Sequence, residues 1–415
     1  MFCAILFLPW ANALSCRERS PFVFDFIYKK TAVCFSLFDQ IIIMGTHTKL
    51  NYIHIFRAVA IIIIVLGHCV YASPSALNSF VDTFIRGGTT LFVFISGFLF
   101  QYLSDTFSYP TYLKKKFFNI ILPYLFASIF GIALVLSNFK FNPFISANKI
   151  VQVGMLLTTG RIHNLPTWYI PMTCIFFLFA PILLNLEKKI IFRKYSLLFF
   201  GLPVLLCISC FVPRFELHFF VTKTMSAWQA YAGHLEKILF DTILFFPIYI
   251  LGMLFAAYRD KYIEYIYKKR VWIWTIFIAG CIVHFFLQYY RFLPSRVLFN
   301  NFMLMLLILG YLWHYDETIK SHTHINNVLG TVADYSFSIF FFHFYFIFVF
   351  DRIMEYFFHL NKYYLSSANF HFDYWILFVI IRFSVAFFGS LFAAMLIKKV
   401  LEKFGIKHTR WFVGA

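Results

Sequence analysis

Charged residues are scarce in this sequence: only 13% of its 415 residues are Asp, Glu, Lys or Arg. A soluble domain carries about 25%. A charged side chain is costly inside the hydrocarbon core of a bilayer, so this shortage is typical of chains that lipid surrounds. At the same time 61% of the residues are hydrophobic and 61 are Phe, more than one water-soluble core can hold. The composition therefore excludes a soluble globular protein and indicates an integral membrane protein.

Signals of metal, disulfide and multidomain proteins are also missing. Most of the eight cysteines lie inside apolar runs, which does not look like a disulfide framework. Cys207 and Cys210 form a C-x-x-C, but within LLCISCF, where the polar setting of a zinc or redox site is absent. No internal repeat and no Gly/Ser- or Pro-rich linker interrupts the chain. We therefore expect no bound metal or cofactor and no long soluble domain.

The net charge of +18 has a membrane explanation. A basic stripe with interleaved aromatic residues, as nucleic-acid binding requires, is not present. Lys and Arg collect in cytoplasmic loops of membrane proteins and favour anionic lipid headgroups. The expected partner of this charge is the lipid bilayer, not nucleic acid.

Apolar runs of about 17–25 residues are the unit that spans a bilayer. Ten such runs follow Met44 and predict an all-α polytopic bundle of about ten transmembrane helices. They cover residues 53–71, 88–103, 117–137, 167–186, 196–213, 240–258, 271–290, 296–313, 332–352 and 374–397.

The loops between these runs differ in charge. Those on one side hold 18 Lys and Arg and those on the other hold 10. The side richer in Lys and Arg is normally cytoplasmic. We therefore expect a bacterial inner or plasma membrane protein with both termini on the cytoplasmic side. The longest outside loops, about 138–166 and 214–239, are polar enough to form part of a surface-facing site.

The chain ends differ from this transmembrane domain, which we assign to residues 44–400. Residues 1–43 form an N-terminal extension with an apolar stretch but no basic segment before it, so they make a poor signal peptide. Two interpretations stay open: translation begins at Met44, or an extra, partly buried helix precedes it. Residues 401–415 are expected to be a basic cytoplasmic tail.

The first predicted helix carries two ionisable residues at membrane depth, Arg57 and His68. Eleven residues make three turns plus about 20°, so both lie on one helix face, with a rise of about 16 Å between them. Arg57 suits anion binding near the cytoplasmic end, and His68 suits a general base near the outer end. Each also has a structural interpretation: Arg57 as an interface residue that snorkels, and His68 as a capping or packing histidine.

These residues and four further segments resemble the acyltransferase-3 family of membrane O-acyltransferases. The segments occur in the family's order between about residues 50 and 397. After Arg57-x10-His68 come TTLFVFISGFLF with Ser96, YLKKKFFNIILPYLF, LPTWYIPMTCIFFLFAPIL with Trp168, and YSFSIFFFHFYF ending near His343.

The resemblance implies about ten spans, a cytoplasmic acyl-CoA donor substrate and a hydroxyl acceptor, often on a surface glycan. It also implies that His68 is catalytic and that Arg57 belongs to the donor site. Lys114, Lys115 and Lys116 suit the phosphates of coenzyme A. The family's basic loop often has Arg where this chain has Lys116 and Asn119, so bidentate phosphate binding is lost there.

Three further residues are candidates to line the same cavity: Ser96, His343 and Trp168. Each has a structural alternative. Ser96 with Gly97 allows close helix approach, His343 can be a hydrogen-bonded core histidine, and Trp168 suits the aromatic belt. For Asp351 and Arg382, which flank or enter predicted helices, charge pairing or interface anchoring is the expectation.

The sequence thus favours a membrane O-acyltransferase. It would move an acetyl or succinyl group from cytoplasmic acyl-CoA to a hydroxyl of an extracytoplasmic polysaccharide or lipid-linked glycan. A transporter or flippase for a polysaccharide precursor is the main alternative, and a non-catalytic scaffold of an export assembly is a weaker one.

The predicted topology is testable by cysteine labelling. With a cysteine at position 115 or 362, a reagent that cannot cross the membrane should reach position 362 and not position 115 in intact cells. The physical reason is the loop charge asymmetry, which places Lys115 in the cytoplasm. The opposite labelling pattern would overturn the topology.

Overall fold

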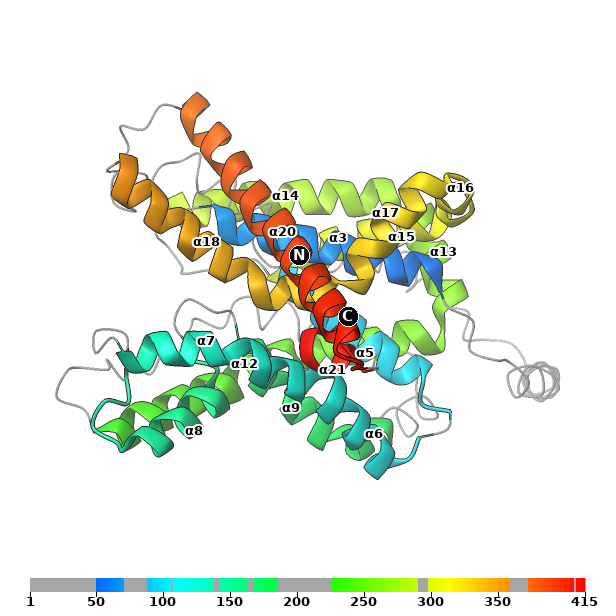
Figure 1. The fold of residues 1–415 in the computed structure, drawn as a ribbon. Coiled ribbons are helices and arrows are strands. Elements are labelled where there is room, and N and C mark those ends of the chain that lie inside the picture. The colour runs from blue at the N-terminus through cyan, green and yellow to red at the C-terminus, as the bar shows by residue number, and fades with distance from the viewer. Residues whose placement is uncertain are drawn as a thin grey trace, which may run out of the picture. The chain divides into compact units, whose positions relative to one another are not determined.

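The computed structural model describes residues 50–70, 88–105, 107–137, 142–162, 167–185, 226–289, 298–358, 372–406 and 408–414. All of its helices belong to the unit that begins at Asn51. Throughout these residues the regular structure is helical, with no strand, so the all-α class is confirmed (Figure 1).

The helices fall into an N-terminal and a C-terminal series. The first series is α3 (Asn51–Cys69), α5 (Gly88–Tyr102), α6 (Tyr109–Lys116), the π-helix η1 (Phe117–Ile121), α7 (Leu122–Ser137), α8 (Lys149–Thr159), α9 (Tyr169–Leu178) and α12 (Ala227–Ala257). The second is α13 (Arg259–Lys268), α14 (Arg270–Tyr289), α15 (Leu298–His314), α16 (Asp316–Ser321), α17 (Thr323–Asp334), α18 (Ser336–Phe358), α20 (Phe372–Lys403) and α21 (Arg410–Val413).

Several described helices are long and apolar enough to cross a membrane. Five qualify, or six if a pair bent by 73° around Lys269 counts as one broken span. The five are Asn51–Cys69, Tyr109–Ser137, Ala227–Ala257, Ser336–Phe358 and Ile376–Lys403. A membrane protein is thereby supported, but the count of ten is not confirmed.

Two reasons explain the smaller count. The predicted run 196–213 lies outside the described residues. The helices α5, α9 and α15 are apolar but have only 15, 10 and 17 residues. At 1.5 Å per residue, none of the three alone covers the roughly 30 Å of a hydrocarbon core.

Both segments predicted as long outer loops contain helix. The side chain of Asn148 accepts a hydrogen bond from the backbone N–H of Val151 at 2.9 Å and begins α8. Ser226 and Gln229 form a capping box that begins α12 well before residue 240. These caps provide hydrogen-bond partners for backbone N–H groups that have none within the first turn of a helix. They explain why these segments form helix where a loop was expected.

Helix α3 is surrounded by other helices. It contacts α5, α15, α17, α18 and α20, and Figure 1 shows α20 crossing over it. Ile55, Phe56, Ala58 and Ile61 are completely buried. A helix that is apolar on all sides belongs in the interior of a bundle. The polar residues on α3 therefore lie among neighbouring helices, with His54 buried and Arg57 and His68 half-buried.

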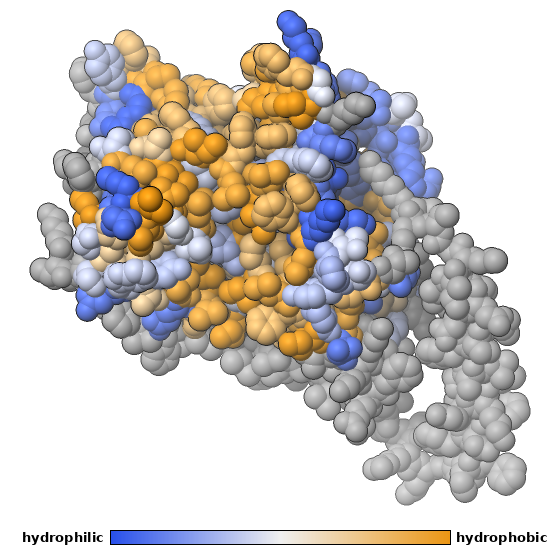
Figure 2. Space-filling model, turned by 60° about the horizontal axis from the view of Figure 1, so that its bottom comes forward, coloured by the Kyte–Doolittle hydropathy of each residue, from blue (hydrophilic) through white to orange (hydrophobic). Residues whose placement is uncertain are grey.

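The surface of the protein carries broad apolar areas. Figure 2 shows one face that is largely hydrophobic and bordered on both sides by hydrophilic residues. Large apolar side chains are exposed on several long helices, such as Ile129 and Phe130 on α7 and Phe388 and Phe392 on α20. Because a monomeric soluble protein rarely exposes so much apolar surface, lipid is the natural solvent for these helices.

Helices α5 and α12 approach each other closely at two glycines. A Cβ atom on Gly97 would collide with the carbonyl oxygen of Tyr249, and one on Gly252 would collide with that of Phe94. Small residues at such positions let two helix backbones pack closely. In a membrane this packing holds helices together, because the hydrophobic effect does not act between them. The expectation that Ser96-Gly97 permits close approach agrees with this contact.

Replacement of these glycines should therefore destabilise the protein. We expect Gly97→Ala to lower the free energy of unfolding by about 1–3 kcal/mol, the usual cost of overpacking. Gly154→Ala on α8 is the matched control, because its Cβ would meet nothing within 4 Å. The control should be neutral or stabilise slightly, since Ala favours helix over Gly. Thermal unfolding in detergent measures both, and equal melting temperatures would contradict the packing.

Candidate active site along helix α3

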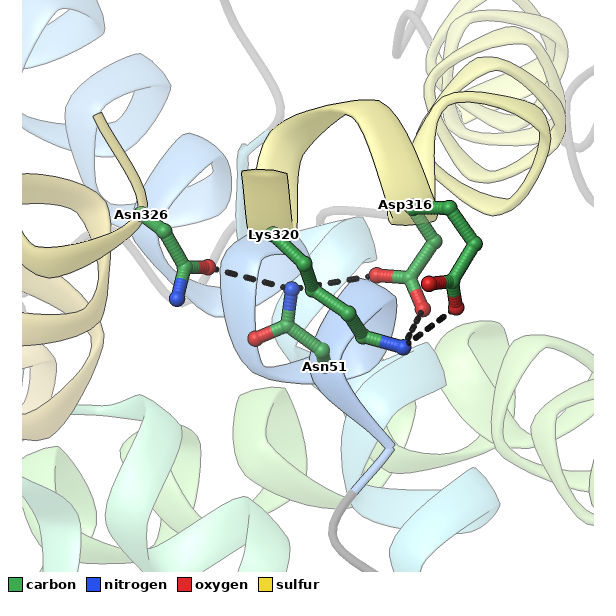
Figure 3. A network of polar contacts seen from close by, with 5 residues as sticks. Asn51, Asp316, Lys320 and Asn326 are labelled. Carbon is green, nitrogen blue, oxygen red and sulfur yellow. Dashed lines mark hydrogen bonds and ion pairs between the residues drawn. The ribbon is translucent and has the colours of Figure 1, made fainter. Parts of the chain in front are cut away.

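A polar network fixes the first residue of α3. The side-chain amide of Asn51 donates to Asp316 and to Asn326, both at 3.1 Å (Figure 3). Lys320 pairs with Asp316 and Glu317 at 2.8 Å each, and these hydrogen bonds raise the pKa of Lys320. The start of α3 is thus held against the short helices α16 and α17.

One turn further along α3, His54 and Arg57 meet the junction between α17 and α18. The Nε2 atom of His54 lies 3.5 Å from a carboxylate oxygen of Asp334. The guanidinium of Arg57 donates to the hydroxyl of Ser336 at 3.1 Å and is attracted by the charge of Asp334. Arg57 is half-buried, so it enters the protein interior instead of only reaching toward headgroups.

His68 lies in the last turn of α3 and meets the same helix, α18, further along. Its ring centroid is 5.5 Å from that of His343 and 4.7 Å from that of Phe344. Arg57 contacts the first residue of α18, so Arg57 and His68 both face this one helix. Their placement matches the shared face that the spacing predicts.

His343 is completely buried beside His68. Its Nδ1 lies 2.9 Å from the carbonyl oxygen of Ile339, and because a carbonyl only accepts, Nδ1 carries the proton. In the neutral ring Nε2 then presents a lone pair. This atom is buried and has no hydrogen-bond partner among the residues that the structure describes. The geometry leaves one ring nitrogen available next to His68.

A buried ion pair holds the end of α3 that carries His68. Arg382 of α20 makes two hydrogen bonds to Asp351 of α18, of 2.9 and 2.7 Å. The same guanidinium donates to the backbone carbonyls of His68 at 3.3 Å and Cys69 at 2.8 Å. The last carbonyls of a helix lack partners within the helix, and Arg382 satisfies two of them. The expected charge pairing of Asp351 and Arg382 is confirmed.

The other cavity candidates lie on neighbouring helices. The hydroxyl of Ser96 donates to the carbonyl of Phe92 at 2.9 Å and shares a 3.1 Å hydrogen bond with the hydroxyl of Tyr169. Rings of Tyr169 and Phe340 are 5.7 Å apart, which links Ser96 to the helix of His343. The neighbouring Trp168 is half-buried and packs against Phe245 of α12.

The three lysines of α6 have different surroundings. Lys114 and Lys115 are exposed in the last turn, whereas Lys116 is half-buried. The ammonium of Lys116 lies 4.8 Å from the ring centroid of Phe177 and 5.2 Å from that of Tyr112. Such cation–π contacts favour a cation that is partly removed from water. Only Lys116 of the three thus points into the protein.

Sequence reasoning missed Ser336 and Tyr169 as neighbours of the site. Both stand inside quoted motifs, Ser336 in YSFSIFFFHFYF and Tyr169 directly after Trp168, so a signal was present. In the described part of the chain, no group of three or more His, Cys, Asp or Glu residues could hold a metal ion.

Comparison with known proteins identifies the family. A family model described as an acyltransferase domain matches residues 50–399. The chain therefore belongs to the acyltransferase-3 family and is a membrane acyltransferase. No curated protein and no solved structure was found to match it.

The Arg382–Asp351 pair gives a test of how the end of α3 is held. Breaking a fully buried ion pair costs about 3–5 kcal/mol, and somewhat less is expected here because Asp351 is partly exposed. Arg382→Gln should therefore lower the melting temperature clearly in detergent. The control is Arg352→Gln, which removes an exposed pair with Glu355 worth about 0–1 kcal/mol. Equal effects of the two changes would contradict a supporting role for Arg382.

Proposed function

We propose that this acyltransferase moves an acetyl or succinyl group from cytoplasmic acyl-CoA to a hydroxyl of an extracytoplasmic polysaccharide or lipid-linked glycan. The observation that carries the proposal is the placement of Arg57 and His68. They lie three turns apart on the face of α3 that meets α18, one suited to bind an anion and one to take a proton.

The donor fits the end of α3 that carries Arg57. Coenzyme A bears several phosphate charges, and a guanidinium binds phosphate through two parallel hydrogen bonds. Arg57 uses one nitrogen on Ser336, and a guanidinium has five N–H donors in all. The rise of about 16 Å to His68 is close to the length of an extended pantetheine arm. A phosphate bound at Arg57 would thus present the thioester near His68.

The chemistry at His68 is general-base catalysis. A hydroxyl is a weak nucleophile at neutral pH and needs a base within hydrogen-bond reach, for which histidine has the best-matched pKa. His68 takes the hydroxyl proton while the oxygen attacks the thioester carbonyl. The tetrahedral intermediate then collapses, the C–S bond breaks, and the proton passes from His68 to the departing sulfur. The products are an ester and free coenzyme A.

His343 suits an auxiliary role in this step. Its Nε2 lone pair is buried beside His68 and can accept a hydrogen bond from the acceptor hydroxyl. Such a contact would orient the nucleophile without removing its proton. Because a buried polar atom without a partner is unfavourable, a ligand hydroxyl there would also gain binding free energy.

A transporter for a polysaccharide precursor would explain the apolar helices and the basic charge equally well. It would need neither a base nor an anion-binding residue on one face of α3. Membership of an acyltransferase family favours the enzymatic reaction over transport.

Substitution of His68 tests the proposal. His68→Gln keeps hydrogen bonding and bulk but cannot take a proton at neutral pH. We expect it to insert at the wild-type level and to lose about 10²–10⁴-fold in transfer rate, the usual contribution of a general base. The measurement is the ester content of the surface glycan from cells that express each protein equally.

His343→Gln is the comparison, and it should keep partial activity if this residue only orients the acceptor. Full acylation of the glycan by the His68→Gln protein would remove the central role of His68 and favour the transporter.

A further inference from the structure

The C-terminal segment 408–414 is folded onto the helices of the site, although the family match ends at residue 399. The hydroxyl of Ser338 donates to the backbone carbonyl of Val413, and Val413 is 1% exposed. The ring of Trp411 packs on Phe118 at 4.5 Å, and that of Phe412 on Phe126 at 5.9 Å. Helix α21 is thus attached to η1, α7 and α18.

This attachment places Arg410 near two cations of the proposed donor site. The next residue, Trp411, packs on Phe118, two positions after Lys116. Val413 is bonded by Ser338, two positions after Ser336, the partner of Arg57. These contacts put the charge of Arg410 where it acts unfavourably on the charges of both Arg57 and Lys116. The three cations come from three separate parts of the chain, helices α3, α6 and α21. Arg410 is itself exposed and so is available to a ligand, while Arg57 and Lys116 each keep part of their surface accessible.

Three like charges brought together in a membrane protein are unfavourable without an anion. The carboxylate that attracts Arg57 is Asp334, which is largely exposed and also lies beside His54. The ammonium of Lys116 is supported by the aromatic rings of Phe177 and Tyr112. A ligand with more than one negative charge would relieve the repulsion that Arg410 exerts on both Arg57 and Lys116.

We propose that Arg410 is the third cation of the donor site, and that Arg57, Lys116 and Arg410 together bind the phosphate groups of acyl-CoA. This inference rests on the proposed function for the choice of ligand. Arg410 then supplies a guanidinium, which can bind phosphate through two hydrogen bonds, near the lysines of α6. The contacts of Trp411, Phe412 and Val413 hold it in place.

The test measures binding of coenzyme A and of pantetheine to purified full-length protein. Pantetheine shares the thiol arm of coenzyme A but has no phosphate. Arg410→Gln should weaken coenzyme A binding about 10- to 100-fold, the range for a charge-assisted hydrogen bond, and leave pantetheine binding unchanged. Lys403→Gln is the matched control, a cation at the exposed end of α20, and should change neither.

The outcomes separate this inference from the proposed function. If Arg57→Gln weakens coenzyme A binding and Arg410→Gln does not, the role of Arg410 is wrong while the donor site stands. If the wild-type protein binds no coenzyme A, the proposed function and this inference both fail. If Arg410→Gln weakens binding of the protein to vesicles of anionic lipid and leaves coenzyme A binding unchanged, Arg410 binds lipid headgroups. That result would overturn the proposal.

A second variant covers the case in which Arg410→Gln does not fold. Arg410→Lys keeps the charge and the surrounding contacts but loses the planar fork. It should bind coenzyme A more weakly than wild type and more tightly than Arg57→Gln. Wild-type affinity for coenzyme A in the Arg410→Lys protein would contradict the role of the Arg410 guanidinium.

Discussion

The packing of α3 against α18 determines the geometry of the whole candidate site. Ser336 at the start of α18 accepts a hydrogen bond from Arg57, and His343 further along lies beside His68. Each end of this contact is secured by a second polar interaction, the Asn51 network at one end and Arg382 with Asp351 at the other. Polar groups enclosed among apolar helices are stable only when they are paired, so these pairs leave α3 little freedom to rotate or slide.

Periodicity and composition were sufficient to predict the parts of the fold that depend on local sequence. The apolar runs placed α3, α7, α18 and α20, and helical spacing put Arg57 and His68 on one face, because both signals are carried by residues close together in the chain. The start of α12 at Ala227 was missed because the apolar run begins later, although Ser226 and Gln229 form a capping box that the sequence contains.

Long-range contacts could not be predicted in this way. Arg382 donates to the backbone carbonyl of His68, although the two residues are 314 positions apart in the sequence. No pattern in either segment predicts this contact. The same holds for the C-terminal segment: composition suggested a basic tail, whereas Val413 and Thr409 are buried. Which apolar faces meet depends on packing of many helices at once, and such information is spread over the entire chain.

The central claim is that donor and acceptor reach α3 from opposite sides of the membrane. Inverted and right-side-out membrane vesicles from cells that contain the acceptor glycan test this directly, with labelled acyl-CoA added to the outside of each. The account predicts label in the glycan of inverted vesicles, where the Arg57 end of α3 faces the added donor, and almost none in intact right-side-out vesicles. Equal labelling of both, or label in right-side-out vesicles alone, would contradict it.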